Sequence, residues 1–366
     1  MLSIIKIKGI KDMTGKQRII NAINGRPSDI HPVTIHGWGL YKFGFYDKYS
    51  GIDDYSLQDD AWDICGNELA NVEIRFHELF DCDWIHLSDG KWNDIKKRIN
   101  DPANRELLKA VRCLESKSAI DEFIETIYLP EEELYASNKY DHIKILSEKY
   151  DAELFIQMNL AGPIFDIADH DGVLGFEECM IAMIEKEEMF QYLAHGMYTK
   201  QLDIVQVIKN LGAQGYLQTE GYIATDLISI DLYERTMHDI LKEFYSKVNN
   251  IGIIPMCYFT GDCLGLIKKI RELDIKVLLV EESKKNFRLE PAEIIKEIGE
   301  DRAVVGNVDS VNVLLRGTEE EVRKYAAKQL LECKSDCFIS GTGSPIPFGT
   351  PPDNINAFID EIRNTF

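Results

Sequence analysis

The sequence predicts an α/β fold, a (β/α)8 TIM barrel, on three observations. Eight short β-rich segments alternate with helical segments along the chain. This alternation is typical of parallel strands joined by crossover helices, and eight repeats favour a closed barrel. With 366 residues, of which 45% are hydrophobic, the chain can fill one large core. No Gly-, Ser- or Pro-rich linker divides it, so we expect a single domain over residues 1–366.

The first predicted element is a helix that begins after Thr14, because Thr14 and Gln17 form a capping-box pattern and Gly25 and Pro27 follow the helical run. Helices are also predicted between the β-rich segments, for example over 176–193, 231–244 and 319–331. The interval 90–151, after the second strand, is long enough for a helical insertion near the barrel mouth. The eight predicted strands span 31–36, 83–89, 152–159, 214–220, 252–260, 276–282, 302–307 and 336–341.

Charge and composition exclude several classes of function. The 41 basic and 62 acidic side chains give a net charge of −21, which argues against a nucleic-acid partner. No apolar run approaches the roughly 20 residues of a membrane helix. Eight scattered cysteines without a signal peptide indicate reduced thiols, and we expect a cytoplasmic protein.

Polar side chains follow the predicted strands at their carboxyl ends, where the chemistry of such barrels takes place. Because strand ends generally become polar as they leave the core, part of this set is structural. The residues are His36, Asp89, Asn159, Glu220, Tyr258 with Thr260, Glu281 with Glu282, Asn307 with Asp309, and Thr342 with Ser344.

Several of these residues have a structural alternative. Asp89 precedes a helical run and can serve as its N-cap. Glu220 ends an otherwise uncharged strand, which favours a functional role, since burying an unneeded carboxylate is costly. Asn307 follows a glycine in a tight turn and is expected to bond backbone groups first. Glu281 and Glu282 are adjacent, so only one should face inward while the other pairs with a nearby lysine.

Six stretches of the chain resemble the uroporphyrinogen decarboxylase superfamily, which includes corrinoid-linked methyltransferases. The resemblance implies a TIM barrel and suggests that residues 1–12 are an added leader. The stretches are M-T-G-K-Q-R-I-I-N-A-I-N-G-R-P-S-D-I-H-P-V (13–33), L-A-G-P (160–163), Y-F-T-G-D (258–262), V-V-G-N-V-D (304–309), L-L-R-G-T-E-E-E-V (314–322) and T-P-P-D-N-I-N-A-F (350–358).

The first loop distinguishes this chain from decarboxylases of the superfamily. Those enzymes hold a polycarboxylate with an Arg-rich segment after the first strand, and they use an Asp at the position of Asp89. Here residues 36–49 contain no Arg, two Lys and six aromatic residues. Lysines bind carboxylates less well than bidentate arginines do. Porphyrinogen decarboxylation is therefore disfavoured.

The thiol methyltransferases of the superfamily bind zinc through His-x-Cys and a later Cys. Tyr258, Thr260 and Ser344 stand at those positions here, and Cys257 is one residue out of register, so that it should point away from the barrel interior. A zinc ion, if bound, would need harder ligands, for which Glu220, Glu282 and His86 are the candidates.

The resemblance then favours the branch that demethylates a small donor and passes the methyl group to Co(I) of a partner corrinoid protein. Its cobalamin would be carried by that partner. Because the leaving group needs a proton, Asp89 and Tyr258 are candidate catalytic proton donors. Glu220 is the third candidate catalytic residue, which could orient the donor or a metal. The aromatic first loop favours an O-methyl aromatic donor over a methylamine. Candidate substrate-binding residues are His36, Trp38, Tyr41, Phe43, Asn159, Thr260, Asn307 and Ser344.

Two alternatives stay open at this point. One is a decarboxylase that acts on a non-porphyrin carboxylate through Asp89. The other is a barrel that binds a corrinoid without catalysis. The sequence also leaves a homodimer open.

Overall fold

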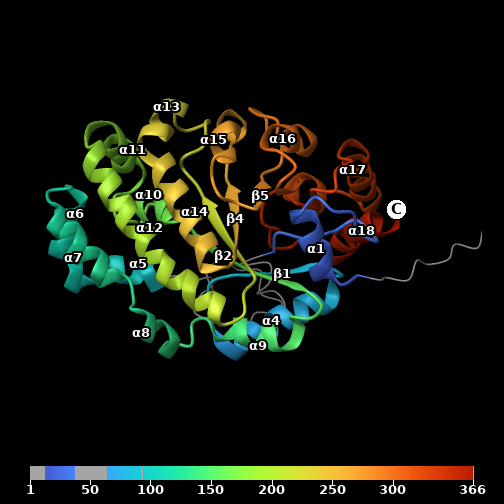
Figure 1. Ribbon diagram of the computed structural model, residues 1–366, viewed down its shortest axis with the longest axis horizontal. Helices are drawn as coiled ribbons and strands as arrows, with labels where there is room; N and C mark the ends of the chain where they lie inside the picture. Colours follow the sequence, from blue (N-terminus) through green and yellow to red (C-terminus); the bar gives the residue numbers. More distant parts are fainter. Residues whose placement is uncertain (1–12, 38–63, 92–93, 366) are drawn as a thin grey trace, which may run out of the picture.

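Seven parallel strands form one curved sheet in the computed structural model, which describes residues 13–37, 64–91 and 94–365 (Figure 1). Each strand is hydrogen-bonded to the next in chain order, as in a barrel built from successive β–α units. The predicted barrel class is confirmed. The strands are β1 Trp84–Leu87, β2 Phe155–Ala161, β3 Gly215–Glu220, β4 Ile254–Phe259, β5 Val277–Val280, β6 Ala303–Val308 and β7 Phe338–Thr342.

The first predicted strand, 31–36, occupies the eighth position without becoming a strand. Val33 forms a single parallel bridge with Ser340 of β7, and the Thr34 amide donates to the Ser340 carbonyl at 2.9 Å. On its other side, the Asp83 amide donates to the Val33 carbonyl at 2.9 Å, just before β1. Pro32 has no amide hydrogen, which limits the ladder. The prediction of a strand here was wrong, although the segment bridges the two edges of the sheet.

Side chains alternate between the barrel interior and the surrounding helices along each strand. Trp84, Phe155, Met256 and Tyr258 belong to the interior group. Helix α1 (Gly15–Ile23) packs Ile19 and Ile23 into this group, and its predicted capping box between Thr14 and Gln17 is present.

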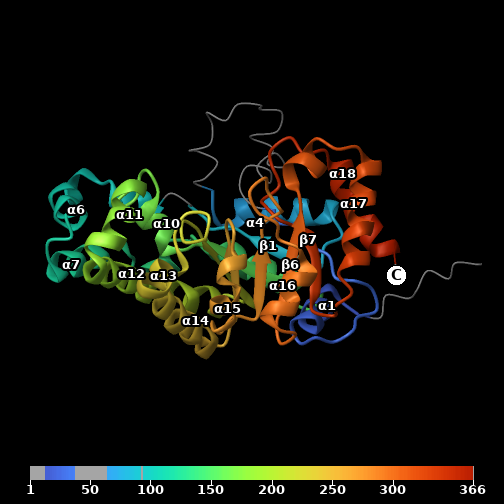
Figure 2. The ribbon, with the colours of Figure 1, turned by 90° about the horizontal axis from the view of Figure 1, so that it is seen from above.

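Helices cover the outside of the sheet. Figures 1 and 2 both place α6 and α7 at one end of the molecule and α17 and α18 at the other. None of the helices in the described ranges combines the length and apolarity needed to cross a membrane. Short 3-10 or π segments are η2 Pro102–Asn104, η3 Glu234–His238, η4 Leu264–Leu266 and η5 Ser310–Leu315. The other helices are α4 Gly66–Leu79, α5 Asp94–Ile99, α6 Arg105–Arg112, α7 Lys117–Ile127, α8 Glu131–Ala136, α9 Asp141–Tyr150, α10 Pro163–Ala168, α11 Phe176–Glu185, α12 Glu187–Asn210, α13 Ile230–Tyr233, α14 Asp239–Ile251, α15 Ile267–Arg271, α16 Pro291–Ile298, α17 Glu319–Glu332 and α18 Pro352–Asn364.

A buried carboxylate joins the two ends of the described chain. Asp83, which is 1% exposed, accepts hydrogen bonds from Arg18 of α1 at 3.0 Å and from both terminal nitrogens of Arg363 of α18 at 2.9 Å. It also accepts the Val33 amide at 2.8 Å. One side chain therefore holds α1, the 31–36 segment, the start of β1 and α18 together.

We expect Asp83→Asn to lower the free energy of unfolding by about 3–5 kcal/mol, because it leaves the guanidinium groups of Arg18 and Arg363 without their shared buried carboxylate. Urea denaturation at neutral pH measures the change. The control is Glu188→Gln, which breaks an exposed ion pair with Lys117 and should have little effect. Equal stability of the two variants would show that Asp83 does not hold these elements together.

Candidate functional site

A group of polar and aromatic side chains meets at the carboxyl end of the barrel interior. We define the interior cluster as His36, His86, Tyr258, Glu281, Glu282 and Ser344. The His36 ring stacks on His86, with ring centroids 4.6 Å apart, and meets Tyr258 edge-on at 4.7 Å. Strand alternation produces this arrangement, because His86 is two residues after Trp84 and Tyr258 is two residues after Met256, both interior residues.

Two carboxylates complete the interior cluster. The Tyr258 hydroxyl donates to Glu281 Oε1 at 3.3 Å, and Ser344 Oγ donates to Glu282 Oε2 at 2.7 Å. Lys284 Nζ donates to Glu281 Oε2 at 2.5 Å. We expected the inward glutamate and the lysine-paired glutamate to be different residues, but Glu281 has both roles. Strand β5 ends at Val280, so strict alternation does not extend to these two glutamates.

Burial controls protonation in the interior cluster. Burial, reinforced by the charges of Glu281 and Glu282, raises the pKa of the Tyr258 phenol well above 10. Burial also raises the pKa of Glu282, although its hydrogen bond from Ser344 opposes this. Tyr258 therefore keeps its proton across the physiological range and can donate it.

Other predicted binding residues bond to the protein itself. Asn159 donates to Thr219 Oγ1 at 2.9 Å, and Thr260 donates to the Glu220 carbonyl at 3.2 Å. Asn307 donates to the carbonyls of Glu281 at 2.8 Å and Leu289 at 2.5 Å, so it makes the backbone bonds expected of it. Three further candidates lie outside the described residues, namely Trp38, Tyr41 and Phe43.

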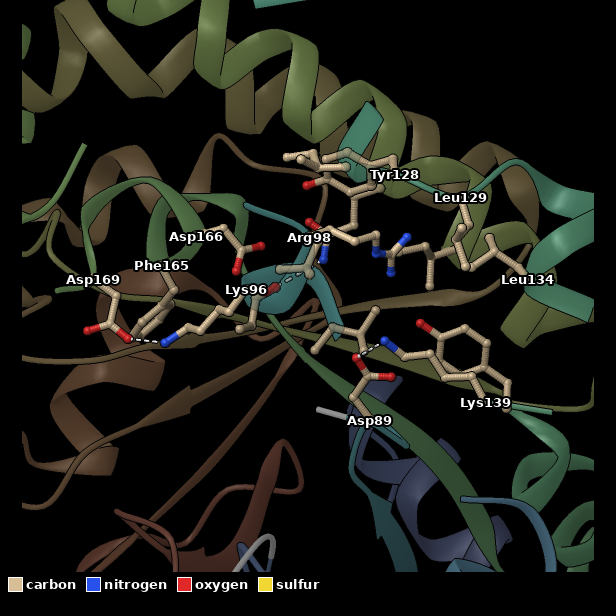
Figure 3. A pocket seen from close by; sticks show the side chains of 17 residues that line it. Asp89, Lys96, Arg98, Tyr128, Leu129, Leu134, Lys139, Phe165, Asp166 and Asp169 are labelled. Carbon is tan, nitrogen blue, oxygen red and sulfur yellow. Dashed lines mark hydrogen bonds and ion pairs between the residues drawn. The ribbon is translucent and has the colours of Figure 1, made fainter. Parts of the chain in front are cut away.

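Asp89 lies apart from the interior cluster. Its Oδ2 is 2.9 Å from Lys139 Nζ, and both residues line a cavity between the ends of β1 and β2 and the helices of the segment 94–150 (Figure 3). Burial raises the Asp89 pKa to about 6. Because Trp84 and His86 face inward, alternation sends Asp89 to the outer side, a signal present in the sequence. Lys139 was missed because no motif surrounds it.

Glu220 also lies on the outer side of the sheet, and not at the barrel mouth where we expected it. It receives hydrogen bonds from the hydroxyls of Tyr198 on α12, at 2.6 Å, and Tyr245 on α14, at 3.3 Å. Leu217 belongs to the interior group, and Glu220 is three residues further on, so it faces the helices. Burial raises the Glu220 pKa to about 8.

The proposed zinc ligands do not converge. Glu220 faces the helices, whereas Glu282 and His86 belong to the interior cluster. Among the described residues, the only three acidic, histidine or cysteine side chains with ligand atoms within 4.8 Å of one another are Asp169, His170 and Asp171. The three candidate residues do not fit a shared zinc ion, and we assign no catalytic step to zinc.

The chain is similar to one protein family and to several methyltransferases. Residues 118–365 match the family described as uroporphyrinogen decarboxylase (URO-D). The chain is similar to a methylated-thiol–coenzyme M methyltransferase of Methanosarcina mazei, with 23% identity over 60% of this chain and 56% of the relative. It is also similar to the methylcobamide:CoM methyltransferase MtbA of Methanosarcina acetivorans, with 26% identity over 61% of this chain and 62% of the relative. The chain thus matches less than two thirds of the length of these relatives.

A solved methyltransferase structure from Methanosarcina mazei has a TM-score of 0.71 to this chain at 17% identity, covering 96% of this chain and 98% of that one. At this identity the likeness shows a shared fold. The fold is thus common to nearly the whole of both chains.

The Glu220 pKa predicts how stability varies with pH. Because this pKa is about 8 in the folded protein, against an ordinary value of 4.5, its contribution to stability is full below about pH 4.5 and is lost as the pH rises to about 8. The loss is at most about 1.4 kcal/mol per pH unit. Glu220→Gln, which cannot ionise, should flatten the profile and be more stable than the wild type at pH 8. Urea denaturation between pH 5 and 8.5 measures this.

The matched control is Glu297→Gln, an exposed position on α16, which should keep the wild-type profile. Identical pH profiles for Glu220→Gln and the wild type would mean that Glu220 is already ionised in the folded protein.

Proposed function

The chain belongs to the uroporphyrinogen decarboxylase family, and we propose that it is a corrinoid-dependent methyltransferase. In this proposal it removes a methyl group from a small donor and passes it to the Co(I) of a partner corrinoid protein. The names of the similar methyltransferases support a role in methyl transfer, and for MtbA the name includes a methylcobamide. The interior cluster supports the direction of transfer.

The observation that carries the proposal is the contact between Tyr258 and Glu281. In an in-line displacement, the bond between the methyl carbon and the donor heteroatom breaks, and its electron pair stays on the heteroatom. A basic leaving group must then gain a proton. The Tyr258 hydroxyl, whose single hydrogen is directed at Glu281 Oε1 at 3.3 Å in the resting site, turns to the departing atom and supplies the proton, and Tyr258 regains a proton from solvent afterwards. Lys284 balances the charge of Glu281. The corrinoid supplies the cobalt that accepts the methyl group.

The aromatic rings of the cluster favour the donor class. His36, His86 and Tyr258 form a continuous set of ring contacts, which offers flat surfaces to an aromatic donor. The aromatic residues of the first loop point to the same class. We therefore propose an O-methyl aromatic as the preferred donor and a methylamine as the second.

The side chains of the cluster disfavour methylation of a thiol. Tyr258 and Ser344 place hard oxygen atoms at positions where the resemblance implies soft zinc ligands in thiol-activating enzymes of the superfamily. Cys257 packs with the outer core, and burial, followed by the charge of Glu220, raises the pKa of the Cys257 thiol well above 9. The oxygen atoms of Tyr258 and Ser344 do not favour binding of a substrate thiolate, and Cys257 does not favour forming a thiolate of its own.

The test is Tyr258→Phe in a methyl-transfer assay with a Co(I) corrinoid protein, followed by the cobalt absorbance. With methoxybenzene as donor, we expect the rate to fall by about 10²–10⁴-fold, the usual contribution of a general acid. With 4-nitromethoxybenzene, whose phenolate leaves without a proton, the loss should be much smaller. This dependence on the leaving group distinguishes proton donation from a structural role.

The matched control is Tyr245→Phe, which removes a hydroxyl on the outer side of the sheet and should keep the wild-type rates. An equal loss with both donors would contradict proton donation by Tyr258. Turnover of neither aryl ethers nor methylamines by the wild type, or methylation of coenzyme M from a methylcobamide, would contradict the proposed direction of transfer.

A further inference from the structure

The cavity that Asp89 and Lys139 line has a volume of about 260 Å³ and lies on the outer side of the sheet. It is bounded by the ends of β1 and β2, by α10 and α12, and by the helices of the segment 94–150 (Figure 3). None of its lining residues belongs to the interior cluster. Much of the wall is apolar or aromatic, formed by Ile127, Tyr128, Leu129, Leu134, Phe165 and Ile204.

Six charged side chains line this cavity, three acidic and three basic, and most of them are already paired. Lys139 pairs with Asp89 at 2.9 Å. Lys96 pairs with Asp169, and at 2.8 Å with Asp171 outside the wall. Figure 3 shows the pairs Asp89–Lys139 and Lys96–Asp169 joined by dashed lines. The two charged side chains of the cavity wall that remain without a full ion pair are Asp166 and Arg98.

The Asp166 carboxylate has no partner in the part of the chain that the structure describes. It is 9% exposed, accepts no hydrogen bond through its side chain and forms no ion pair. Burial raises its pKa to about 7, although Lys96 and Lys139 oppose this. Because Asp166 lines the cavity, a ligand bound there can supply the hydrogen-bond donor that the protein does not.

Arg98 is only partly satisfied. Its Nε donates to the Asp94 carbonyl at 3.2 Å, and its Nη2 lies 3.9 Å from the Asp94 carboxylate. Its Nη1 is buried and has no hydrogen-bond partner among the residues that the structure describes. Arg98 and Asp166 share the cavity wall, yet they form no ion pair with each other. A ligand that bridges them would satisfy both.

We propose that this cavity binds a small zwitterion, an α-amino acid with an aliphatic or aromatic side chain. Asp166 binds its ammonium group, Arg98 binds its carboxylate, and the apolar wall takes its side chain. A guanidinium group is well suited to a carboxylate, since it presents parallel N–H donors. The site does not depend on the proposed methyl transfer.

Calorimetry with the full chain and no corrinoid tests the site. The probes are L-leucine, isopentylamine, which has only the ammonium group, and 4-methylpentanoate, which has only the carboxylate. We expect L-leucine to bind at least about tenfold more tightly than either analogue, because each charged contact contributes that much or more. L-phenylalanine serves as the aromatic counterpart.

Two variants separate the contacts. Asp166→Asn should weaken the binding of L-leucine at least about tenfold and leave the binding of 4-methylpentanoate unchanged. Arg98→Gln should weaken the binding of L-leucine by as much and leave the binding of isopentylamine unchanged. The matched controls are Asp239→Asn and Arg105→Gln, both exposed positions on helices. A general disturbance of the fold would weaken all three probes alike in both variants, and that result would overturn the proposal.

The proposal also fails if neither amino acid gives saturable heat up to about 5 mM, since binding weaker than this is not specific recognition. It fails if isopentylamine binds as tightly as L-leucine, because the site would then recognise a cation. Because no measurement here involves methyl transfer, these failures leave the proposed function untouched.

Discussion

The carboxylate of Asp83 is the interaction on which the closed form of this barrel depends. Seven strands hydrogen-bond in order, but the eighth position is held by one bridge at Val33 and a few amide bonds. Such a short ladder adds little to the stability of the closed barrel. The contacts of Asp83 with Arg18 and Arg363 therefore provide much of the interaction that closes it. Because the 31–36 segment ends in His36, the same contacts also place that ring over His86.

Closure divides the polar strand ends between two chemical environments. Side chains of one parity face the interior, where Tyr258 and His86 meet around two glutamates. Side chains of the other parity face the helices, where Asp89 pairs with Lys139 and Glu220 bonds two tyrosines. A polar residue at the end of a barrel strand therefore belongs to a catalytic mouth only when its parity places it there.

Local patterns in the sequence predict the barrel, the Thr14 capping box and the outward direction of Cys257. These local patterns give wrong or no predictions where the structure depends on contacts between distant parts of the chain. Segment 31–36 has the composition of a strand, but Pro32 and the weak edge leave one bridge. The position of Glu220 at a strand end predicts the barrel mouth, but its parity relative to Leu217 turns it to the outer side. The outer cavity was not predictable, since Arg98, Lys139 and Asp166 come from distant parts of the chain and are brought together only by helix packing.

The protonation of Tyr258 bears on the methyl donor. Burial and two glutamates make its phenol a weaker acid than an ordinary tyrosine, whose pKa is about 10. A phenol that keeps its proton at physiological pH can donate a hydrogen bond to a departing amine or aryl-ether oxygen, and full proton transfer requires a leaving group more basic than the Tyr258 phenolate. A thiolate, with an ordinary pKa near 8.5, leaves without taking a proton and gains little from such a donor. For the methyl transfer that we propose, the interior cluster therefore favours oxygen or nitrogen donors over methylated thiols.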